Sequence, residues 1–233
     1  MRPVLIFGAS RGVGLALARL LRDQSIPVTA MLRSPVASAE LESMGAHVVC
    51  GDAFSCDDVA RAFASHDPVC GVVSTLGGRR ADGRYVDDEG NINVIDQATA
   101  HGVGRFVFVT SIGCGEMAPF RSERAIAAFG AAVDAKTRAE EHLRSVIPEA
   151  TIIRPGGLRS DPATGRGILT SDPQMHGFIN REDVAQLAAR AFFDPATRGR
   201  SFAAVDSDTA RSDNSVAPFD LRPWSENLVS PAI

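Results

Sequence analysis

The feature that most constrains the fold is a regular alternation of short apolar runs with segments that have the apolar spacing of helices. The apolar runs are Val4–Phe7, Val28–Leu32, His47–Cys50, Val69–Ser74, Phe106–Thr110 and Thr151–Arg154. None alternates cleanly between polar and apolar residues, which is typical of parallel strands covered on both faces. Strands that alternate with helices form βαβ units with right-handed crossovers. The pattern therefore predicts an α/β fold built on a doubly wound parallel sheet.

The glycine-rich segment Gly8-Ala9-Ser10-Arg11-Gly12-Val13-Gly14 joins the first expected strand to the first expected helix. Glycine at 8 and 12 lets backbone N–H groups approach a pyrophosphate, and Gly14 permits close packing of helix on strand. The start of the helix adds free N–H groups and the positive end of its dipole. We therefore predict a Rossmann-type fold that binds a dinucleotide through Gly8, Ser10, Arg11, Gly12 and Val13.

The end of the second expected strand indicates which dinucleotide binds. NAD-binding proteins carry Asp or Glu there for the adenosine ribose, whereas this chain has Met31-Leu32-Arg33-Ser34. The guanidinium of Arg33 matches the geometry of a 2′-phosphate, and Arg11 adds a second cation. The alternative is that Arg33 is a solvated surface charge. We predict NADP(H) as the cofactor.

Two further strand ends are expected to contact the cofactor, because ligands lie beyond the carboxyl ends of parallel strands. Asp52 and Ala53 follow the third strand and are predicted to meet the adenine edge. Thr75, Leu76 and Gly77 follow the fourth strand, where the cofactor would cross the sheet. Turn formation alone would also explain the glycines at these two places.

Several functional classes are disfavoured by composition. The net charge of −4 provides no basic surface for nucleic acid or for an anionic membrane. No stretch approaches the roughly 20 apolar residues of a membrane span, and the N-terminus has no cleavage pattern, so we expect a cytoplasmic protein. The cysteines at 50, 56, 70 and 114 and the five histidines have no metal-type spacing. No metal site is predicted.

Later in the chain, a helix is expected over about Glu182–Phe193 and a strand over Phe202–Val205. Asn180 and Asp183 are polar groups suited to cap that helix. The length of 233 residues fits one domain. We expect this domain, with its substrate-side loops, to span residues 1–205.

The remaining residues, 206–233, are predicted to form a C-terminal tail rich in Ser, Asp and Pro. The tail either packs over the domain through Phe219, Leu221 and Trp224 or stays partly mobile.

As a set, several motifs resemble those of the atypical short-chain dehydrogenase/reductases. They are Gly8 to Gly14, Gly51-Asp52, Glu89-Gly90 leading to Asn93, Val109-Thr110-Ser111, Lys136, Arg154-Pro155-Gly156 and Ile179 to Ala185. Within that superfamily the chain is most similar to the NmrA-like and biliverdin-IXβ-reductase (flavin reductase)-like branch. The resemblance covers residues 3–205 and is more specific for the fold than for the reaction.

The resemblance also implies roles near the nicotinamide. Ser111 stands where the family has a serine after the fifth strand, and Lys136, the only lysine, where the family has the lysine that holds the nicotinamide ribose. The alternative for Lys136 is a helix-surface lysine paired with Glu140. Pro155, Gly156, Gly157 and Leu158 resemble the segment that backs the nicotinamide, although a simple strand-to-loop turn would explain them equally well.

The chain departs from the family pattern at the proton donor. Ala132 occupies the position of the usual active-site tyrosine, and the only tyrosine is Tyr85. Three sources of a proton remain open. Ser111 could polarise a substrate oxygen, Tyr85 or His176 could approach from a loop, or water could supply the proton. The candidate catalytic residues are thus Ser111, Lys136 and Tyr85.

These observations predict an NADPH-dependent oxidoreductase that transfers hydride to a small conjugated or carbonyl-type substrate. Two alternatives remain: an NADP(H)-sensing, NmrA-like regulatory protein, and a redox-neutral isomerase that uses bound cofactor. The expected partner is a small-molecule substrate, with no nucleic acid and no membrane. The substrate itself and the choice between monomer and homodimer stay open, because the loops that would line the substrate pocket are irregular.

Overall fold

A computed structural model describes residues 2–66 and 68–223, and its core is one eight-stranded sheet in the order β3-β2-β1-β4-β5-β6-β10-β8. The strands are β1 (Val4–Phe7), β2 (Val28–Leu32), β3 (His47–Cys50), β4 (Gly71–Ser74), β5 (Phe106–Val109), β6 (Thr151–Pro155), β8 (Gly167–Thr170) and β10 (Ser201–Asp206). All neighbours pair in parallel except β8, which is antiparallel to β10. The strand order reverses direction beside β1. The predicted doubly wound α/β fold is confirmed.

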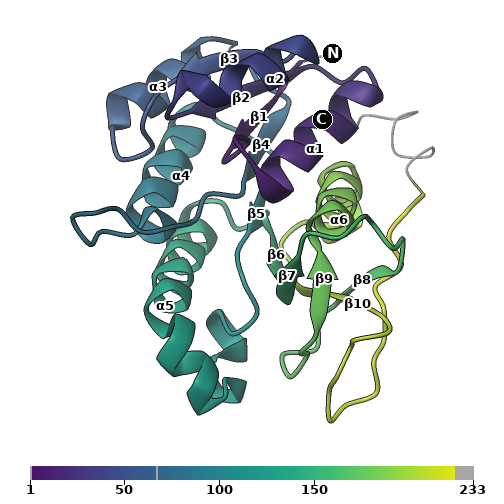
Figure 1. Cartoon of the computed structure of the whole chain (residues 1–233). Helices are drawn as coiled ribbons and strands as arrows, with labels where there is room; N and C mark the ends of the chain where they lie inside the picture. The colour runs from purple at the N-terminus through teal and green to yellow at the C-terminus, as the bar shows by residue number, and fades with distance from the viewer. Residues whose placement is uncertain (1, 67, 224–233) are drawn as a thin grey trace.

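Helices cover both faces of this sheet (Figure 1). On one face, α1 (Gly12–Asp23) and α6 (Arg181–Phe193) lie side by side, with the short α2 (Ser38–Ser43) near the β3 edge. On the other face lie α3 (Cys56–Ala64), α4 (Asn91–Ala100) and α5 (Glu123–Val146). This arrangement places the N-terminal end of α6 close to that of α1, which becomes important for the site.

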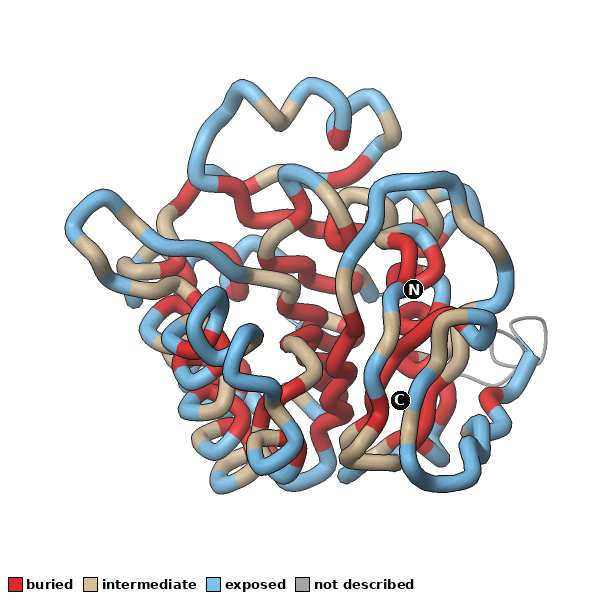
Figure 2. Tube along the Cα trace, turned by 60° about the horizontal axis from the view of Figure 1, so that its bottom comes forward, coloured by how far each residue is buried: buried red, intermediate tan, exposed pale blue. Residues whose placement is uncertain are grey.

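The central strands β1, β2, β4 and β5 are mainly apolar and fully buried because both faces of the sheet are covered there, whereas the edge strand β3 is largely exposed. Val4 and Ile6 of β1 contribute to the core beneath α1 and α6, whereas Leu5 and Phe7 contribute to the core beneath α3, α4 and α5. Figure 2 shows the buried chain concentrated in the interior of the molecule and much of the exposed chain in the outer loops. Two-sided burial therefore accounts for the absence of polar alternation in the sequence.

Helix capping differs from the sequence prediction at one place. Ser55 and Ser122 accept a hydrogen bond from a backbone N–H in the first turns of α3 and α5, as N-cap residues commonly do. Asn180, at the N-cap of α6, makes no such bond. Asp183 instead accepts bonds from the backbone N–H groups of Thr164 and Gly165. The predicted capping role of Asn180 and Asp183 is therefore wrong. The carboxylate of Asp183 binds the backbone of the loop at residues 164–165 instead.

Several short elements had no readable signal in the sequence. Strands β7 (Gly157–Arg159) and β9 (Phe178–Asn180) form a separate two-stranded parallel sheet just beyond the end of β6. A π-helix, η2 (Val86–Gly90), leads directly into α4. The remaining short helical turns are η1 (Pro35–Ala37), η3 (Gly115–Phe120) and η4 (Pro195–Thr197). Elements of three to six residues are too short to show a period.

After β10 the chain packs back onto the domain as far as it is described. The ring of Phe219 lies 4.8 Å from that of Phe202, and Leu221 is buried. Arg190 of α6 donates a hydrogen bond to the backbone oxygen of Leu221. Trp224, the third residue proposed to anchor this segment, lies outside the described residues. In residues 2–66 and 68–223, no helix has the length and apolarity needed to cross a bilayer.

Candidate functional site

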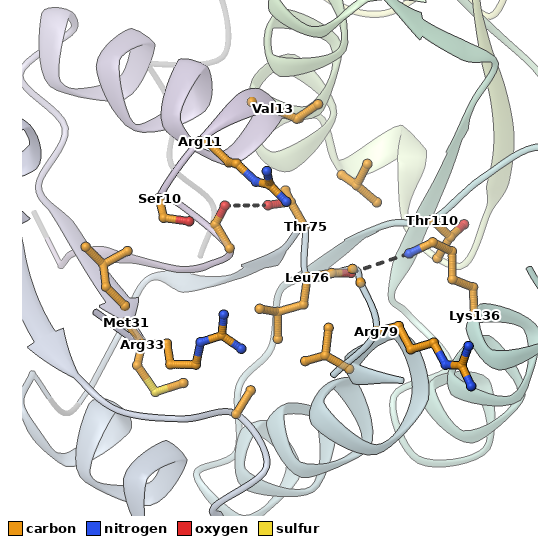
Figure 3. A pocket seen from close by; sticks show the side chains of 18 of the residues that line it. Ser10, Arg11, Val13, Met31, Arg33, Thr75, Leu76, Arg79, Thr110 and Lys136 are labelled. Carbon is orange, nitrogen blue, oxygen red and sulfur yellow. Dashed lines mark hydrogen bonds between the residues drawn. The ribbon is translucent and has the colours of Figure 1, made fainter. Parts of the chain in front are cut away.

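A cavity of about 980 Å³ opens at the carboxyl ends of the central strands (Figure 3). This is the position at which open α/β sheets bind ligands, beside the point where the strand order reverses. The structure brings together there many of the residues singled out in the sequence. These are Gly8, Ser10, Arg11, Gly12, Val13, Arg33, Asp52, Ala53, Thr75, Leu76, Gly77, Lys136 and Leu158.

The glycine loop has the geometry that a pyrophosphate requires. Gly8 and Gly12 adopt φ angles of 92° and 61°, which residues with a side chain rarely adopt. A Cβ atom at Gly8 would lie 2.6 Å from Oγ1 of Thr75, and one at Gly14 would overlap the carbonyl oxygen of Gly8. The N-cap of α1, Arg11, forms no side-chain cap, so no side chain competes for the first N–H groups of the helix. The loop therefore fits a bound phosphate group.

The cavity is strongly positive although the chain carries a net charge of −4. Its lining contains six cationic side chains, those of Arg11, Arg33, Arg79, Arg80, Lys136 and Arg181. Among the described residues that line it, Asp52 has the only carboxylate, and this lies 2.9 Å from Nη1 of Arg80. Figure 3 shows Arg11 and Arg33 on one side and Lys136 on the other. A cavity with this balance of charge attracts a polyanion such as a dinucleotide.

The loop between β4 and η2 adds residues that the sequence analysis missed. The guanidinium groups of Arg80 and Arg84 lie 4.8 and 4.7 Å from the ring centre of Phe54. Together with the Arg80–Asp52 ion pair, these contacts attach the loop to the segment after β3. Phe54, Arg79 and Arg80 all line the cavity. Two loops separated in sequence meet here, and no local pattern in the sequence indicates such a meeting.

Lys136 lies at the other end of the cavity and is held by two groups. Its ammonium forms an ion pair with the buried carboxylate of Asp87 and donates a 3.4 Å hydrogen bond to the backbone oxygen of Leu76. The second oxygen of Asp87 accepts a 2.7 Å hydrogen bond from the N–H of Gly78. The alternative pairing of Lys136 with Glu140 is wrong, since Asp87 of the π-helix is its partner.

Thr110, which the sequence analysis named only as part of a motif, lines the cavity, whereas the predicted Ser111 does not. The hydroxyl of Thr110 donates a 2.6 Å hydrogen bond to Oε1 of the buried Glu140. Because this bond uses the single hydroxyl proton, Thr110 presents only lone pairs to the cavity and acts there as an acceptor.

Glu140 is itself held by a buried arginine. Nε and Nη2 of Arg154 bind its two carboxylate oxygens at 3.1 and 2.6 Å, and Nη1 lies 2.7 Å from Glu116. Burial opposes the charge on Arg154, but its hydrogen bonds to Glu140 and Glu116 outweigh that effect and raise its pKa above the usual value. The network therefore keeps a charged pair directly beneath Thr110.

Five predicted residues do not line the cavity: Ser111, Tyr85, Pro155, Gly156 and Gly157. Tyr85 instead has the guanidinium of Arg79 over its ring, 5.4 Å from the ring centre. A Cβ atom at Gly156 would overlap the backbone oxygen of Gly177, and one at Gly157 would lie 2.5 Å from the ring of Phe178. Glycine is therefore needed at these two positions because they pack closely against Gly177 and Phe178.

His176, Cys70 and Cys114 are titratable, but the structure gives none of them a place in the cavity lining. His176 is exposed, and its backbone is hydrogen-bonded in both directions to Arg211. Burial raises the pKa of the Cys70 thiol and raises that of Cys114 to about 12, so both stay protonated at neutral pH. Within the part of the chain that the structure describes, no cluster of His, Cys, Asp or Glu could hold a metal ion.

Comparison with known proteins places the chain among nicotinamide-dependent proteins. The model of the NAD(P)H-binding family matches residues 8–195. A Bacillus subtilis (strain 168) protein named "Uncharacterized sugar epimerase YhfK" is 30% identical over 209 residues, which are 88% of this chain and 95% of that protein. The match spans most of both chains, so it concerns the whole domain.

Solved structures agree with this relationship. ChuY, an anaerobilin reductase from Escherichia coli O157:H7, superimposes with a TM-score of 0.82 and 36% identity over 90% of this chain and 100% of its own. The oxidoreductase YlbE from Lactococcus lactis shares the fold, with a TM-score of 0.74 and 19% identity over 89% of this chain and 92% of its own. The chain belongs to the NAD(P)H-binding family, and its likeness to ChuY is consistent with the resemblance to the biliverdin-reductase-like branch of the atypical short-chain dehydrogenase/reductases.

Proposed function

We propose that the protein is an NADPH-dependent reductase that transfers hydride to a small conjugated or carbonyl-type acceptor. The observation that carries this proposal is that one continuous cavity joins the glycine loop and Arg33 to Lys136 and Thr110. A dinucleotide that lay along it would have its phosphates at one end and its nicotinamide at the other. The cationic lining suits the four negative charges of such a ligand better than a neutral one.

The residues of the chain act by binding and orienting. The N–H groups of the glycine loop and Arg11 hold the pyrophosphate, and Arg33 holds the 2′-phosphate. Lys136, fixed by Asp87, orients the nicotinamide ribose. When bound, the cofactor supplies the hydride.

The proton is proposed to come from water. Ala132 has no acidic proton, and the hydroxyl proton of Thr110 is bonded to Glu140. Ser111, Tyr85 and His176 are not among the residues that line the cavity. A reductase without a side-chain proton donor is best suited to conjugated acceptors, whose reduced forms stabilise negative charge until solvent protonates them.

The test is to mix the purified protein with NADPH and a panel of quinones, flavins, enones, ketones and a linear tetrapyrrole. The tetrapyrrole is the first acceptor to examine, because the similar protein ChuY is described as an anaerobilin reductase. We expect NADPH to be oxidised with at least one conjugated acceptor. Tight binding of NADPH without oxidation by any of them would contradict the reductase and favour an NADP(H)-sensing regulator, the second candidate.

A redox-neutral isomerase is the third candidate, and the name of YhfK is the observation that favours it. Such an enzyme needs a group that removes and returns a hydroxyl proton of the substrate. In the cavity lining, Lys136 is paired with Asp87 and Thr110 is committed to Glu140. Because both side chains are already bound to other groups, neither is suited to exchange a proton with a sugar hydroxyl, and this supports the reductase. Conversion of a sugar substrate without net change in NADPH would reverse this preference.

Replacement of Arg33 by glutamate is expected to change the choice of cofactor. One charge-assisted hydrogen bond to a phosphate is worth roughly 1.5–3 kcal/mol, so the affinity for NADP⁺ should fall by about ten- to a hundredfold. The affinity for NAD⁺, which has no 2′-phosphate, should change much less. Calorimetric titration of both ligands measures this, with Arg124→Glu on the exposed start of α5 as a matched control. An equal loss for both ligands would show that Arg33 does not read the phosphate.

A further inference from the structure

Arg181, the first residue of α6, brings a positive charge to the glycine loop from a distant part of the chain. It lines the same cavity as the loop. A Cβ atom at Gly12 would lie 3.4 Å from Cδ of Arg181 and 3.5 Å from its Nε, so the arginine lies directly alongside the loop. The position follows from the packing of α1 against α6 (Figure 1).

The acidic neighbours of Arg181 do not neutralise it. Glu182 accepts a 2.9 Å hydrogen bond from the N–H of Ala163, and Asp183 accepts bonds from Thr164 and Gly165. Among the described residues, no carboxylate forms an ion pair with Arg181. Its guanidinium is instead oriented by a 2.7 Å hydrogen bond from Nη1 to the hydroxyl of Ser160, another residue of the cavity lining.

The helix that carries Arg181 adds to the positive potential. No side chain caps the N-terminus of α6, and the buried Oδ1 atom of Asn180 has no hydrogen-bond partner. The uncapped N–H groups and the helix dipole therefore reinforce the charge of Arg181 at this position. An anionic group bound at the first turn of α1 would therefore also lie beside this positive charge.

We infer that Arg181, oriented by Ser160, is a further dinucleotide-binding residue that contacts the pyrophosphate from beside the glycine loop, next to Gly12. The pyrophosphate then lies between the N-terminal ends of α1 and α6. This inference rests on the proposed cofactor, but not on the hydride transfer. It also ties the cofactor to the substrate-side segment, because residues 160–165 are hydrogen-bonded to the first turn of α6.

The test compares NADP⁺, NAD⁺ and 2′-AMP by calorimetric titration of the full chain and of Arg181→Gln. NADP⁺ and NAD⁺ contain the pyrophosphate, whereas 2′-AMP contains only the adenosine and its 2′-phosphate. We expect Arg181→Gln to weaken NADP⁺ and NAD⁺ by a similar factor, about ten- to a hundredfold, and to leave 2′-AMP unchanged. Arg181→Lys, which keeps the charge, should restore part of the affinity. Arg124→Gln serves as the control for loss of an exposed arginine.

The outcomes separate this inference from the proposed function. Unchanged NADP⁺ affinity in Arg181→Gln would overturn the role of Arg181 while leaving the cofactor in place. An equal loss of 2′-AMP affinity would also overturn it, because the effect would then not be specific to the pyrophosphate. If the unmodified protein bound none of the three ligands, the proposed function would fail first and the inference with it.

Hydrogen exchange provides a second measurement that does not depend on affinity. NADP⁺ should slow amide exchange in residues 157–166, whereas saturating 2′-AMP should not. The difference should disappear in Arg181→Gln at ligand concentrations that still saturate the site. Equal protection by NADP⁺ in the variant would show that another residue makes the connection.

Discussion

Replacement of Glu140 by alanine is expected to destabilise the protein by roughly 3–5 kcal/mol, the usual cost of removing one partner of a buried ion pair. Arg154 would keep its charge, because a guanidinium does not deprotonate in proteins, and it would lose its hydrogen bonds to Glu140 in a buried position. The exposed Glu116 would be its remaining carboxylate partner. Such a loss is a large part of the roughly 5–15 kcal/mol that stabilises a typical domain.

Chemical denaturation measures this prediction, and Glu141→Ala is the matched control. Glu141 is the next residue of α5 but is exposed, so its replacement should change the unfolding free energy by less than about 0.5 kcal/mol. Glu140→Gln should fall between the two, since it keeps the shape but not the charge. A loss below about 1 kcal/mol for Glu140→Ala would mean that water or another residue replaces the carboxylate.

Replacement of Gly14 by alanine is expected to abolish tight binding of NADP⁺. The added Cβ would overlap the carbonyl oxygen of Gly8 and lie 2.6 Å from Oγ1 of Thr75. A backbone oxygen cannot rotate away as a side chain can, so the loop must move from its place above the helix. Loss of two phosphate hydrogen bonds, at roughly 1.5–3 kcal/mol each, corresponds to at least a hundredfold loss of affinity.

The same change should reduce stability by roughly 1–3 kcal/mol, the usual cost of inserting a methyl group into a filled space. Gly104→Ala is the control, because a Cβ there meets no atom within 4 Å. That variant should bind NADP⁺ like the unmodified protein. Unchanged NADP⁺ affinity in Gly14→Ala would show that the phosphates do not depend on the position of this loop.

The sequence could predict the elements whose signals are local. The strands Val4–Phe7, Val28–Leu32 and His47–Cys50 occur with the predicted bounds, because each is a short, mainly apolar run followed by arginine or glycine. The helix predicted from Glu182 begins one residue earlier. Strands β7 and β9 escaped prediction because their three residues are held by contacts with each other.

The site residues with local sequence signals could likewise be predicted, and those without such signals could not. The glycine loop and Arg33 belong to segments next to strand ends, where fold and ligand position are linked by a general rule. Thr110 also follows a strand end, but its hydrogen bond to Glu140 could not be predicted. Arg181 has no strand-end signal, since its role depends on Gly12, which is distant in sequence. Lys136 could be located by its resemblance to the family lysine, but its partner Asp87 could not.

The sequence by itself thus determined the doubly wound sheet and the glycine loop above it, because apolar periodicity and glycine conformation act within a few residues. Only the tertiary structure decided which charges meet. It paired Lys136 with Asp87, buried Glu140 with Arg154, and brought Arg181 to Gly12. Electrostatic partners act through space, at distances that depend on how helices from both halves of the chain pack on one sheet.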